Sequence, residues 1–208
     1  MNAITYKDLF PLIQDNKVWL GATNFNQGMY FRVPEGFIYA ESYKFEREQD
    51  GVKVNRVPGV CWFTNIEHGR RHQPLQLLTM EENLRFNKKI QGKNAYQQYD
   101  NYNAIEVPVT SAIPSDYDGV MGVPISFLDK YCPEQFEILG MCENEDLYNL
   151  KTKVYSSQEK NDAYFAKFGK KGNYDLNASA VLETNNRLEK VYQRILIRHI
   201  KKELNNEN

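Results

Sequence analysis

The stretch YDGVMGVPISFLDKY, residues 117–131, is the least polar long segment of the chain and constrains its fold most strongly. Two closely spaced glycines, Gly119 and Gly122, would let backbone amides approach an anion, so a phosphate-binding loop is one interpretation. Asp116 and Asp118 would then stand beside the phosphate, and no basic residue follows before position 130. Carboxylates repel such a ligand, so the charge pattern favours a structural role.

We therefore interpret this stretch as a buried joint. Gly119 and Gly122 are predicted to occupy tight-turn positions, where glycine tolerates backbone conformations that other residues avoid. Pro124 would precede a short helix that starts near Ser126. Three large side chains are expected to pack inward: Phe127, Leu128 and Tyr131.

Composition limits the classes of protein that this chain can belong to. Its 208 residues are 41% hydrophobic, enough for one domain or two small ones. With 26 basic and 27 acidic side chains the net charge is −1, so binding to nucleic acid would need a local basic patch. No apolar segment approaches the roughly 20 residues that span a bilayer, and no secretory signal is visible. The three cysteines form no CxxC pair, so we expect a cytoplasmic protein without disulfides, structural zinc or a membrane partner.

The first third of the sequence predicts one helix and several strands. Thr5 is a plausible N-cap for a helix over residues 4–16, which Pro11 would kink. Asp50-Gly51 predicts a hairpin turn within residues 46–59. Apolar, β-rich runs predict strands at 17–21 and 28–33, and a buried strand at 60–65.

The remainder is more mixed. Thr79 and Glu82 form a capping-box pattern for a helix that Gly92 would end. Residues 143–177 are weakly patterned, and we expect loops with short helices there. Residues 188–200 fit a helical stripe slightly better than a strand. Further strands are predicted at 75–79, 104–109 and 135–142, the last with Phe136, Ile138 and Gly140 on one side.

No nucleophile or metal motif emerges from the histidines. His68, His72 and His199 lie outside any recognisable serine or cysteine nucleophile pattern. A metal site would need His68 and His72 one helical turn apart, but Gly69 and two arginines in HGRRH disfavour a bound cation. We therefore predict no catalytic residue and no metal ligand.

Two arginine pairs are candidates for binding nucleic acid: Arg70 with Arg71, and Arg194 with Arg198. Arginine forks suit phosphates and guanine edges, and the nearby amides of Asn65 and Gln73 could read adenine. A solvated loop is the plain alternative for the first pair. From the residues alone, the prediction stops at a soluble α/β or α+β domain with polar recognition loops.

Several stretches, taken together, resemble the C-terminal half of adenine-specific DNA methyltransferases of the EcoRI type. The similarity runs in order from about residue 2 to about residue 200. The stretch YDGVMGVPISFLDKY followed by PEQFEILG is its most specific part. The other segments are NAITYKDLFPLIQDNKVWLG, GVCWFTNIEHGRRH, YDNYNAIEV and YQRILIR.

This resemblance implies transfer of a methyl group from S-adenosylmethionine to the exocyclic amine of adenine in duplex DNA. The family's NPPF-type catalytic tetrapeptide and its glycine-rich cofactor loop are absent from these residues. We therefore expect no catalytic or cofactor-binding residue here, no bound cofactor, and no activity from this chain alone. A missing N-terminal catalytic half is the expected protein partner, and duplex DNA the expected substrate.

The resemblance also implies a fold and a set of DNA contacts. Residues 1–70 would be the C-terminal remnant of a Rossmann-like class I methyltransferase sheet, with 17–21 and 60–65 as its last two strands. Residues 71–208 would form a mixed α+β recognition region, and residues 192–198 would be extended, against the helical count. The predicted DNA-binding residues are Asn24, Asn26, Arg32, Asn65, His68, Arg70, Arg71, Arg194 and Arg198. Two alternatives remain open: a non-catalytic DNA-binding module that acts alone or complements a separate chain, and a decayed remnant.

Overall fold

The computed structural model describes residues 2–23, 28–34, 36–38, 46–58 and 60–201. The chain divides into two compact units, unit 1 with residues 1–70 and unit 2 with residues 71–208. The two domains expected from the sequence, with the functions assigned to them, stay predictions. Every helix in the described part is too short or too polar to cross a bilayer.

The N-terminal helix of unit 1 is shorter than the sequence predicts. A 3₁₀ helix, Asn2–Thr5, is followed by the α-helix α1, Phe10–Gln14. Leu9 occupies the N-cap position of α1, so the expected cap at Thr5 is wrong. Pro11 lies in the first turn, where its missing N–H has no intrahelical partner to lose, and the expected kink is wrong as well.

Two short strands follow in unit 1, β1 (Trp19–Leu20) and β5 (Phe63–Thr64), and they pair antiparallel. Both β1 residues are buried, as the apolar run predicts. The expected buried strand at 60–65 is only partly correct. Its regular part is two residues long, and the Trp62 side chain is 57% exposed.

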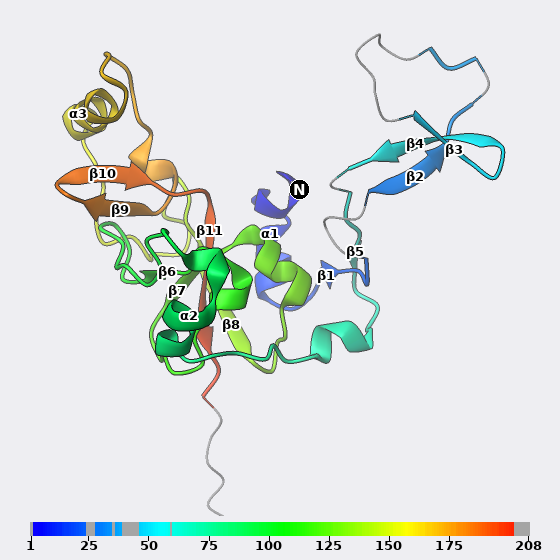
Figure 1. Ribbon diagram of the computed structural model, residues 1–208, viewed down its shortest axis with the longest axis horizontal. Helices are drawn as coiled ribbons and strands as arrows, with labels where there is room; N and C mark the ends of the chain where they lie inside the picture. The colour runs from blue at the N-terminus through cyan, green and yellow to red at the C-terminus, as the bar shows by residue number, and fades with distance from the viewer. Residues whose placement is uncertain (1, 24–27, 35, 39–45, 59, 202–208) are drawn as a thin grey trace, which may run out of the picture. The chain divides into compact units, whose positions relative to one another are not determined.

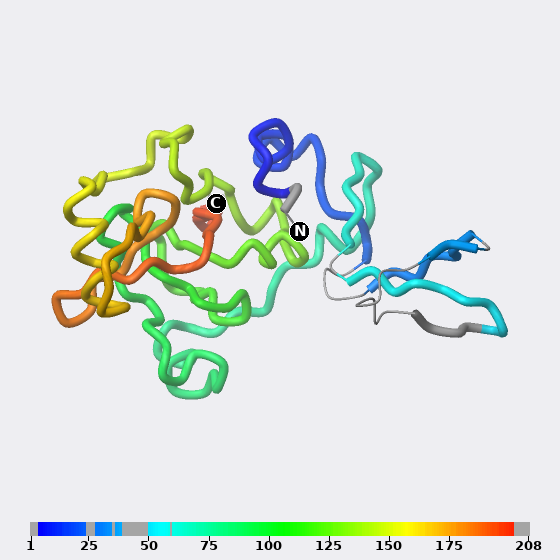
Figure 2. Tube along the Cα trace, turned by 90° about the horizontal axis from the view of Figure 1, so that it is seen from above, coloured from blue at the N-terminus to red at the C-terminus, as the bar shows by residue number. Residues whose placement is uncertain are grey.

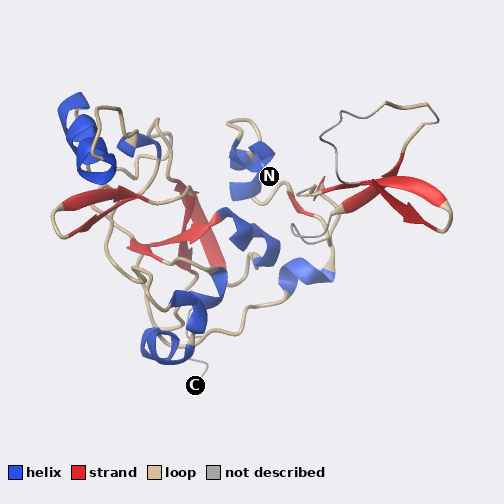
Figure 3. Ribbon diagram, turned by 45° about the horizontal axis from the view of Figure 1, so that its top comes forward, coloured by secondary structure: helices blue, strands red, loops and turns tan. Residues whose placement is uncertain are grey.

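A second sheet of unit 1 contains β2 (Met29–Arg32), β3 (Glu46–Gln49) and β4 (Val52–Val57), in the antiparallel order β2–β4–β3 (Figure 3). Asp50 and Gly51 join β3 to β4 with φ angles of 52° and 73°. Two consecutive positive φ angles are typical of a type I′ turn, whose twist matches that of the paired strands. The predicted hairpin and the strand at 28–33 are confirmed.

Unit 2 is built around a four-stranded mixed sheet, and Figure 1 shows its strands β6, β7, β8 and β11. The strand order is β6–β7–β11–β8, with β6 parallel to β7 and the other pairs antiparallel. Long segments of chain therefore separate strands that are neighbours in the sheet. The bounds are Ile105–Glu106 for β6, Met121–Pro124 for β7, Phe136–Met141 for β8 and Arg194–His199 for β11.

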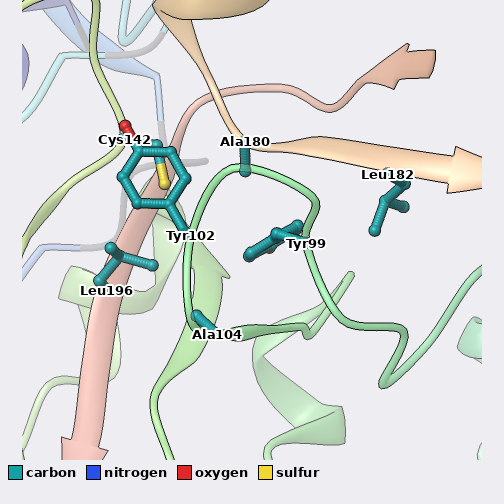
Figure 4. Close-up of a cluster of buried hydrophobic side chains, with 7 residues drawn as sticks. All are labelled: Tyr99, Tyr102, Ala104, Cys142, Ala180, Leu182 and Leu196. Carbon is teal, nitrogen blue, oxygen red and sulfur yellow. The ribbon is translucent and has the colours of Figure 1, made fainter. Parts of the chain in front are cut away.

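The central strand β11 confirms the extended conformation expected for residues 192–198 and overrules the helical periodicity. Ile195, Leu196 and Ile197 are all buried. The strands β7 and β8 flank them on both sides. Continuous apolar runs are typical of such a position. Leu196 belongs to a buried cluster that Figure 4 shows, with Tyr99, Tyr102, Ala104, Cys142, Ala180 and Leu182.

The stretch 117–131 forms a strand followed by a helix. Gly122 lies inside β7, so its expected turn position is wrong. Its lack of a side chain matters for a different reason: a Cβ there would overlap the phenol ring of Tyr99. A 3₁₀ helix, Ile125–Lys130, follows Pro124 as predicted. The three side chains expected to pack inward are all buried: Phe127, Leu128 and Tyr131.

The helix α2, Met80–Phe86, begins at the predicted capping box. The Thr79 hydroxyl accepts from the backbone of Glu82, whose carboxylate accepts from the backbone of Thr79. The helix ends at Asn87 rather than Gly92, because the Asn87 side chain caps a new 3₁₀ helix, Lys88–Ile90. The preceding residues 75–79 form no strand, which corrects the prediction made for them.

The last third holds more regular structure than its sequence indicates. The helix α3, Ser157–Phe168, begins at a capping box and ends at Gly169, whose φ is 67°. It packs against the hairpin of β9 (Val181–Thr184) and β10 (Arg187–Lys190), as the yellow and orange segments of Figure 2 show. Further 3₁₀ helices are Gly69–His72, Thr110–Ala112 and Leu176–Ala178.

The described part therefore has a mixed α/β architecture that contains a mixed sheet. This agrees with the coarse fold class expected from the sequence. The finer expectation, a Rossmann-like remnant in residues 1–70, stays a prediction.

Candidate nucleic-acid interface

The β1–β5 pair positions the predicted recognition loop of unit 1. Trp19 lies opposite Thr64 and Leu20 opposite Phe63, and the backbone N–H of Gly21 donates to Trp62 O at 2.8 Å. Because β5 ends at Thr64, the residues that follow leave the strand beside β1. We call residues 65–70 the recognition segment.

Three side-chain hydrogen bonds attach the recognition segment to residues 19–22. The Trp19 indole Nε1–H donates to Ile66 O at 3.2 Å. His68 Nε2 lies 2.8 Å from Leu20 O and must donate, since a carbonyl only accepts. Arg70 Nη1 donates to Ala22 O at 2.6 Å. These bonds hold the segment in one conformation although it contains no strand or α-helix.

The bonds leave part of the recognition segment facing solvent. Asn65 and Glu67 are exposed, and the Ile66 side chain is 73% exposed. An amide, an apolar side chain and a carboxylate on a fixed backbone are suited to contacts with base edges rather than to neutralising phosphates. Arg70 is half-buried and supplies the positive charge.

Of the other predicted DNA-binding residues of unit 1, the structure describes Arg32. Arg32 is exposed at the end of β2, in the three-stranded sheet. Asn24 and Asn26 lie outside the described residues. DNA contact stays a prediction for all of these residues.

In unit 2, Arg71, Arg194 and Arg198 have different surroundings. Arg71 is buried, with 8% of its surface exposed, which favours a structural role. Arg198 is exposed and pairs with Glu137, Nη2 to Oε2, at 2.8 Å. Arg194 is also buried, and a register shift between residues 196 and 197 of β11 separates it from Arg198. The two β11 arginines therefore do not form a common basic patch.

Arg194 is held inside unit 2 by Glu106. Its Nη2 donates to Glu106 Oε1 at 2.7 Å and its Nε to Oε2 at 3.1 Å. The Tyr99 hydroxyl donates to the same carboxylate. Burial would lower the pKa of Arg194, but the hydrogen bonds that Arg194 donates to Glu106 outweigh burial and raise that pKa. The geometry favours a structural role for Arg194 over the predicted DNA contact.

Reasoning from the sequence missed this buried network. Burial, followed by the charge of Glu106, raises the pKa of the Tyr99 hydroxyl well above its usual value, so it stays a donor. One signal was available: Glu106 stands in the apolar run AIEVPV, where a buried carboxylate needs a cationic partner. The identity of the partner, 88 positions away, was not visible in the sequence.

A cavity of about 720 Å³ lies near the start of unit 2, with His72 and Glu134 in its lining. His72 Nδ1 and Glu134 Oε1 are 2.6 Å apart, and the Cys132 thiol donates to Glu134 Oε2 at 3.1 Å. Burial and the adjacent Glu134 raise the pKa of Cys132, so the thiol stays neutral and is a poor nucleophile. Within the described residues, no group of histidine, cysteine and carboxylate side chains fits a metal ion.

The chain matches a protein-family model described as adenine-specific methyltransferase EcoRI over residues 1–200. It is 41% identical over 155 residues to the type II methyltransferase M.EcoRI of Escherichia coli, an alignment that covers 72% of this chain and 43% of that protein. It is 35% identical over 158 residues to M.MpnI of Mycoplasma pneumoniae, covering 74% and 46%.

A third relative, the type II methyltransferase M.MgeORF184P of Mycoplasma genitalium, is 32% identical over 163 residues, covering 77% of this chain and 49% of the relative. The chain thus spans less than half the length of each of these relatives. No solved structure matches it. The resemblance inferred from the sequence is confirmed, and the chain belongs to the family of adenine-specific methyltransferases of the EcoRI type.

Proposed function

We propose that this chain is the DNA-recognition half of a site-specific DNA adenine methyltransferase that acts in restriction–modification. The complete enzyme would transfer a methyl group from S-adenosylmethionine to the exocyclic amine of adenine in duplex DNA. Family membership supports the reaction class. The observation that carries the recognition role is the fixed segment 65–70, which exposes Asn65, Ile66 and Glu67 beside β1.

The two short strands of unit 1 support a place in the methyltransferase sheet. The resemblance assigns residues 17–21 and 60–65 as the last two strands of a Rossmann-like sheet, and β1 and β5 within these ranges pair with each other. In the described part, neither strand has a second partner. Sheet edges of this kind commonly receive further strands. We propose that the N-terminal half of the enzyme supplies them.

Methyl transfer would then require residues that this chain does not supply. Among the residues that the structure describes, we assign no site to S-adenosylmethionine. The cavity near His72 lacks a glycine-rich turn in its lining, and His72 and Cys132 already occupy both oxygens of its Glu134 carboxylate. We propose that the isolated chain neither binds the cofactor nor methylates DNA. The three free cysteines fit a reducing cytoplasm, where duplex DNA is also present.

Titration calorimetry with S-adenosylmethionine tests whether this chain binds the cofactor by itself. The purified chain should give no binding heat, and clear binding would contradict the proposed absence of a cofactor site. Mixing the chain with the N-terminal part of M.EcoRI, the part that this chain does not cover, should restore transfer of a labelled methyl group to duplex DNA. DNA binding without any such rescue would favour the alternative, a non-catalytic DNA-binding module.

The recognition segment can be tested with one matched pair of variants. On a duplex that the protein itself selects from a random-sequence pool, Asn65→Ala should weaken binding by about 1–3 kcal/mol if the amide reads a base edge. Asn161→Ala is the control, because Asn161 is exposed on α3 in unit 2. Equal affinities for both variants and the parent chain would remove the support for this segment as a reader.

A further inference from the structure

The β2–β4–β3 sheet of unit 1 has two faces of different chemistry. Successive residues of a strand point to opposite faces, and directly opposed residues share a face. Tyr30 lies opposite Arg56 and Arg32 opposite Val54, so these four residues belong to one face. We call this the basic face. The other face carries Met29, Phe31, Lys53, Asn55 and Val57.

The strand β3 pairs antiparallel with β4 along the sheet edge opposite to β2. The described side chains of β2 and β4 determine the chemistry of the two faces. Among these side chains, the basic face carries Arg32 and Arg56 and no carboxylate.

The basic face is accessible to a partner. Arg32 is exposed, and the Tyr30 side chain is 51% exposed. Figure 3 shows no helix of unit 1 packed on this sheet. On the same face Val54 is buried and Arg56 is half-buried, so Arg32 and Tyr30 form its most open part.

Gly28 explains how Arg56 lies on the basic face. A Cβ built at Gly28 would stand 2.6 Å from Arg56 Nε and 2.8 Å from its Cγ. The Arg56 side chain therefore lies against the backbone at Gly28, just before β2. The register places Arg56 opposite Tyr30.

We propose that the basic face binds duplex DNA, with Arg32 and Arg56 contacting backbone phosphates and Tyr30 between them. Arginine forks pair with phosphate oxygens through two parallel hydrogen bonds. Charge complementarity selects this occupant. The chain as a whole has a net charge of −1 and offers no general attraction for DNA, so binding needs a local basic surface such as this face. The inference rests on the proposed recognition function and assigns it a second surface besides the segment 65–70.

The salt dependence of DNA binding by the full chain tests this proposal. Each lost phosphate contact should reduce the slope of log Kobs against log salt by about 0.9. Arg32→Ala with Arg56→Ala should therefore reduce it by roughly two and weaken binding at low salt. Lys170→Ala with Lys171→Ala removes the same charge from exposed positions of unit 2 and should leave the slope unchanged. On β4 itself, Arg56→Ala should lower the slope and Lys53→Ala, on the other face, should not.

The outcomes separate the two levels of the proposal. If the parent chain binds no duplex DNA at low salt, the recognition function fails and the basic face fails with it. If the parent chain binds but the double arginine variant keeps its slope, or loses no more than the lysine control, only the basic face is overturned. Arg32→Lys with Arg56→Lys keeps the charge and should retain most of the slope. Should the double alanine variant unfold, Arg32→Gln alone, at an exposed position, still has to lower the slope by about one.

Discussion

The two units of the chain place their apolar and charged side chains in opposite ways. Unit 2 encloses a continuous set of buried residues around β11, and it buries the Arg194–Glu106 pair among them. Unit 1 buries a small set around α1 and β1, while Tyr30, Phe31 and Trp62 remain at least 41% exposed. Its three-stranded sheet keeps both faces largely open.

This difference teaches where stability and binding reside. An uncovered three-stranded sheet contributes little independent stability, because burial of apolar surface is what offsets the entropy of ordering the chain. Exposed apolar side chains together with arginines instead mark surfaces that meet partners. We infer that unit 2 carries most of the folding free energy and that unit 1 presents binding surfaces. The same kind of substitution should therefore cost more stability at a buried position than at an open one.

The largest expected effect comes from breaking the buried ion pair of β11. Glu106→Ala leaves the guanidinium of Arg194 buried without its carboxylate and should lower the free energy of unfolding by about 3–5 kcal/mol. Glu137→Ala removes the partner of Arg198 on the same strand, where both side chains are 45–50% exposed, and should cost at most about 1 kcal/mol. Urea unfolding followed by circular dichroism measures both. Equal costs would show that the interior of unit 2 is not as closed as its geometry indicates.

A second effect concerns space at two glycines. Gly122→Val places a branched side chain against the Tyr99 ring and should destabilise unit 2 by about 3 kcal/mol. Gly69→Val, in unit 1, meets no atom within 4 Å of its new Cβ and should leave the melting temperature nearly unchanged. Thermal unfolding measures the melting temperatures of both variants and of the parent chain. An intact melting temperature for the Gly122 variant would refute the buried-joint interpretation of residues 117–131.

A third, smaller effect depends on pH. Burial would raise the pKa of Asp100, but hydrogen bonds from Lys153 at 2.6 Å and Tyr155 at 2.7 Å outweigh it and lower that pKa. A carboxyl with a lowered folded-state pKa stabilises the fold above its unfolded pKa of about 3.9, and this contribution is lost as pH falls further. Asp100→Asn should therefore flatten the loss of stability below about pH 4, measured as urea midpoints. Asp162→Asn, at an exposed position of α3, serves as control and should keep the parent profile.

The smallest effects compare the two hairpin turns. Asn186 in the β9–β10 turn has a φ of 57°, so Asn186→Ala should cost about 1 kcal/mol of global stability, since β9 reaches the core through Val181 and Leu182. Gly51→Ala in the β3–β4 turn imposes similar strain at a φ of 73°. Its effect should stay local. Amide exchange in β3 and β4 should become faster, while the urea unfolding midpoint of unit 2 stays unchanged. A shift of that midpoint would contradict the separation of the units.

Local signals in the sequence were sufficient for several elements. The capping box at Thr79, the Asp50-Gly51 turn and the alternation in β8 each depend on residues within a few positions of one another. These predictions were confirmed for that reason. The extended state of β11 came from the family resemblance, because periodicity alone favoured a helix.

Features that depend on distant partners were not predictable in this way. Gly122 was assigned to a turn because its neighbour in space, Tyr99, lies far away in the sequence. The burial of Arg194 against Glu106 was not predictable, because nothing near Arg194 in the sequence reveals its partner. The hairpin β9–β10 and the length of α3 were missed because these elements depend on packing against each other, which local patterns do not show. In the candidate interface, the sequence indicated Asn65 and Arg70 but not the bonds from Trp19 and His68 that fix their backbone.

The strand order of the unit 2 sheet has a consequence for synthesis of the chain. On a ribosome, β7 and β8 emerge long before β11, yet each of them pairs with β11 and not with the other. Until residues 194–199 have left the exit tunnel, the apolar strands Met121–Pro124 and Phe136–Met141 therefore lack their shared partner. This sheet is then expected to close only after residues 194–199 have emerged, and nascent chains stalled before β11 should be targets for chaperones that bind exposed strands.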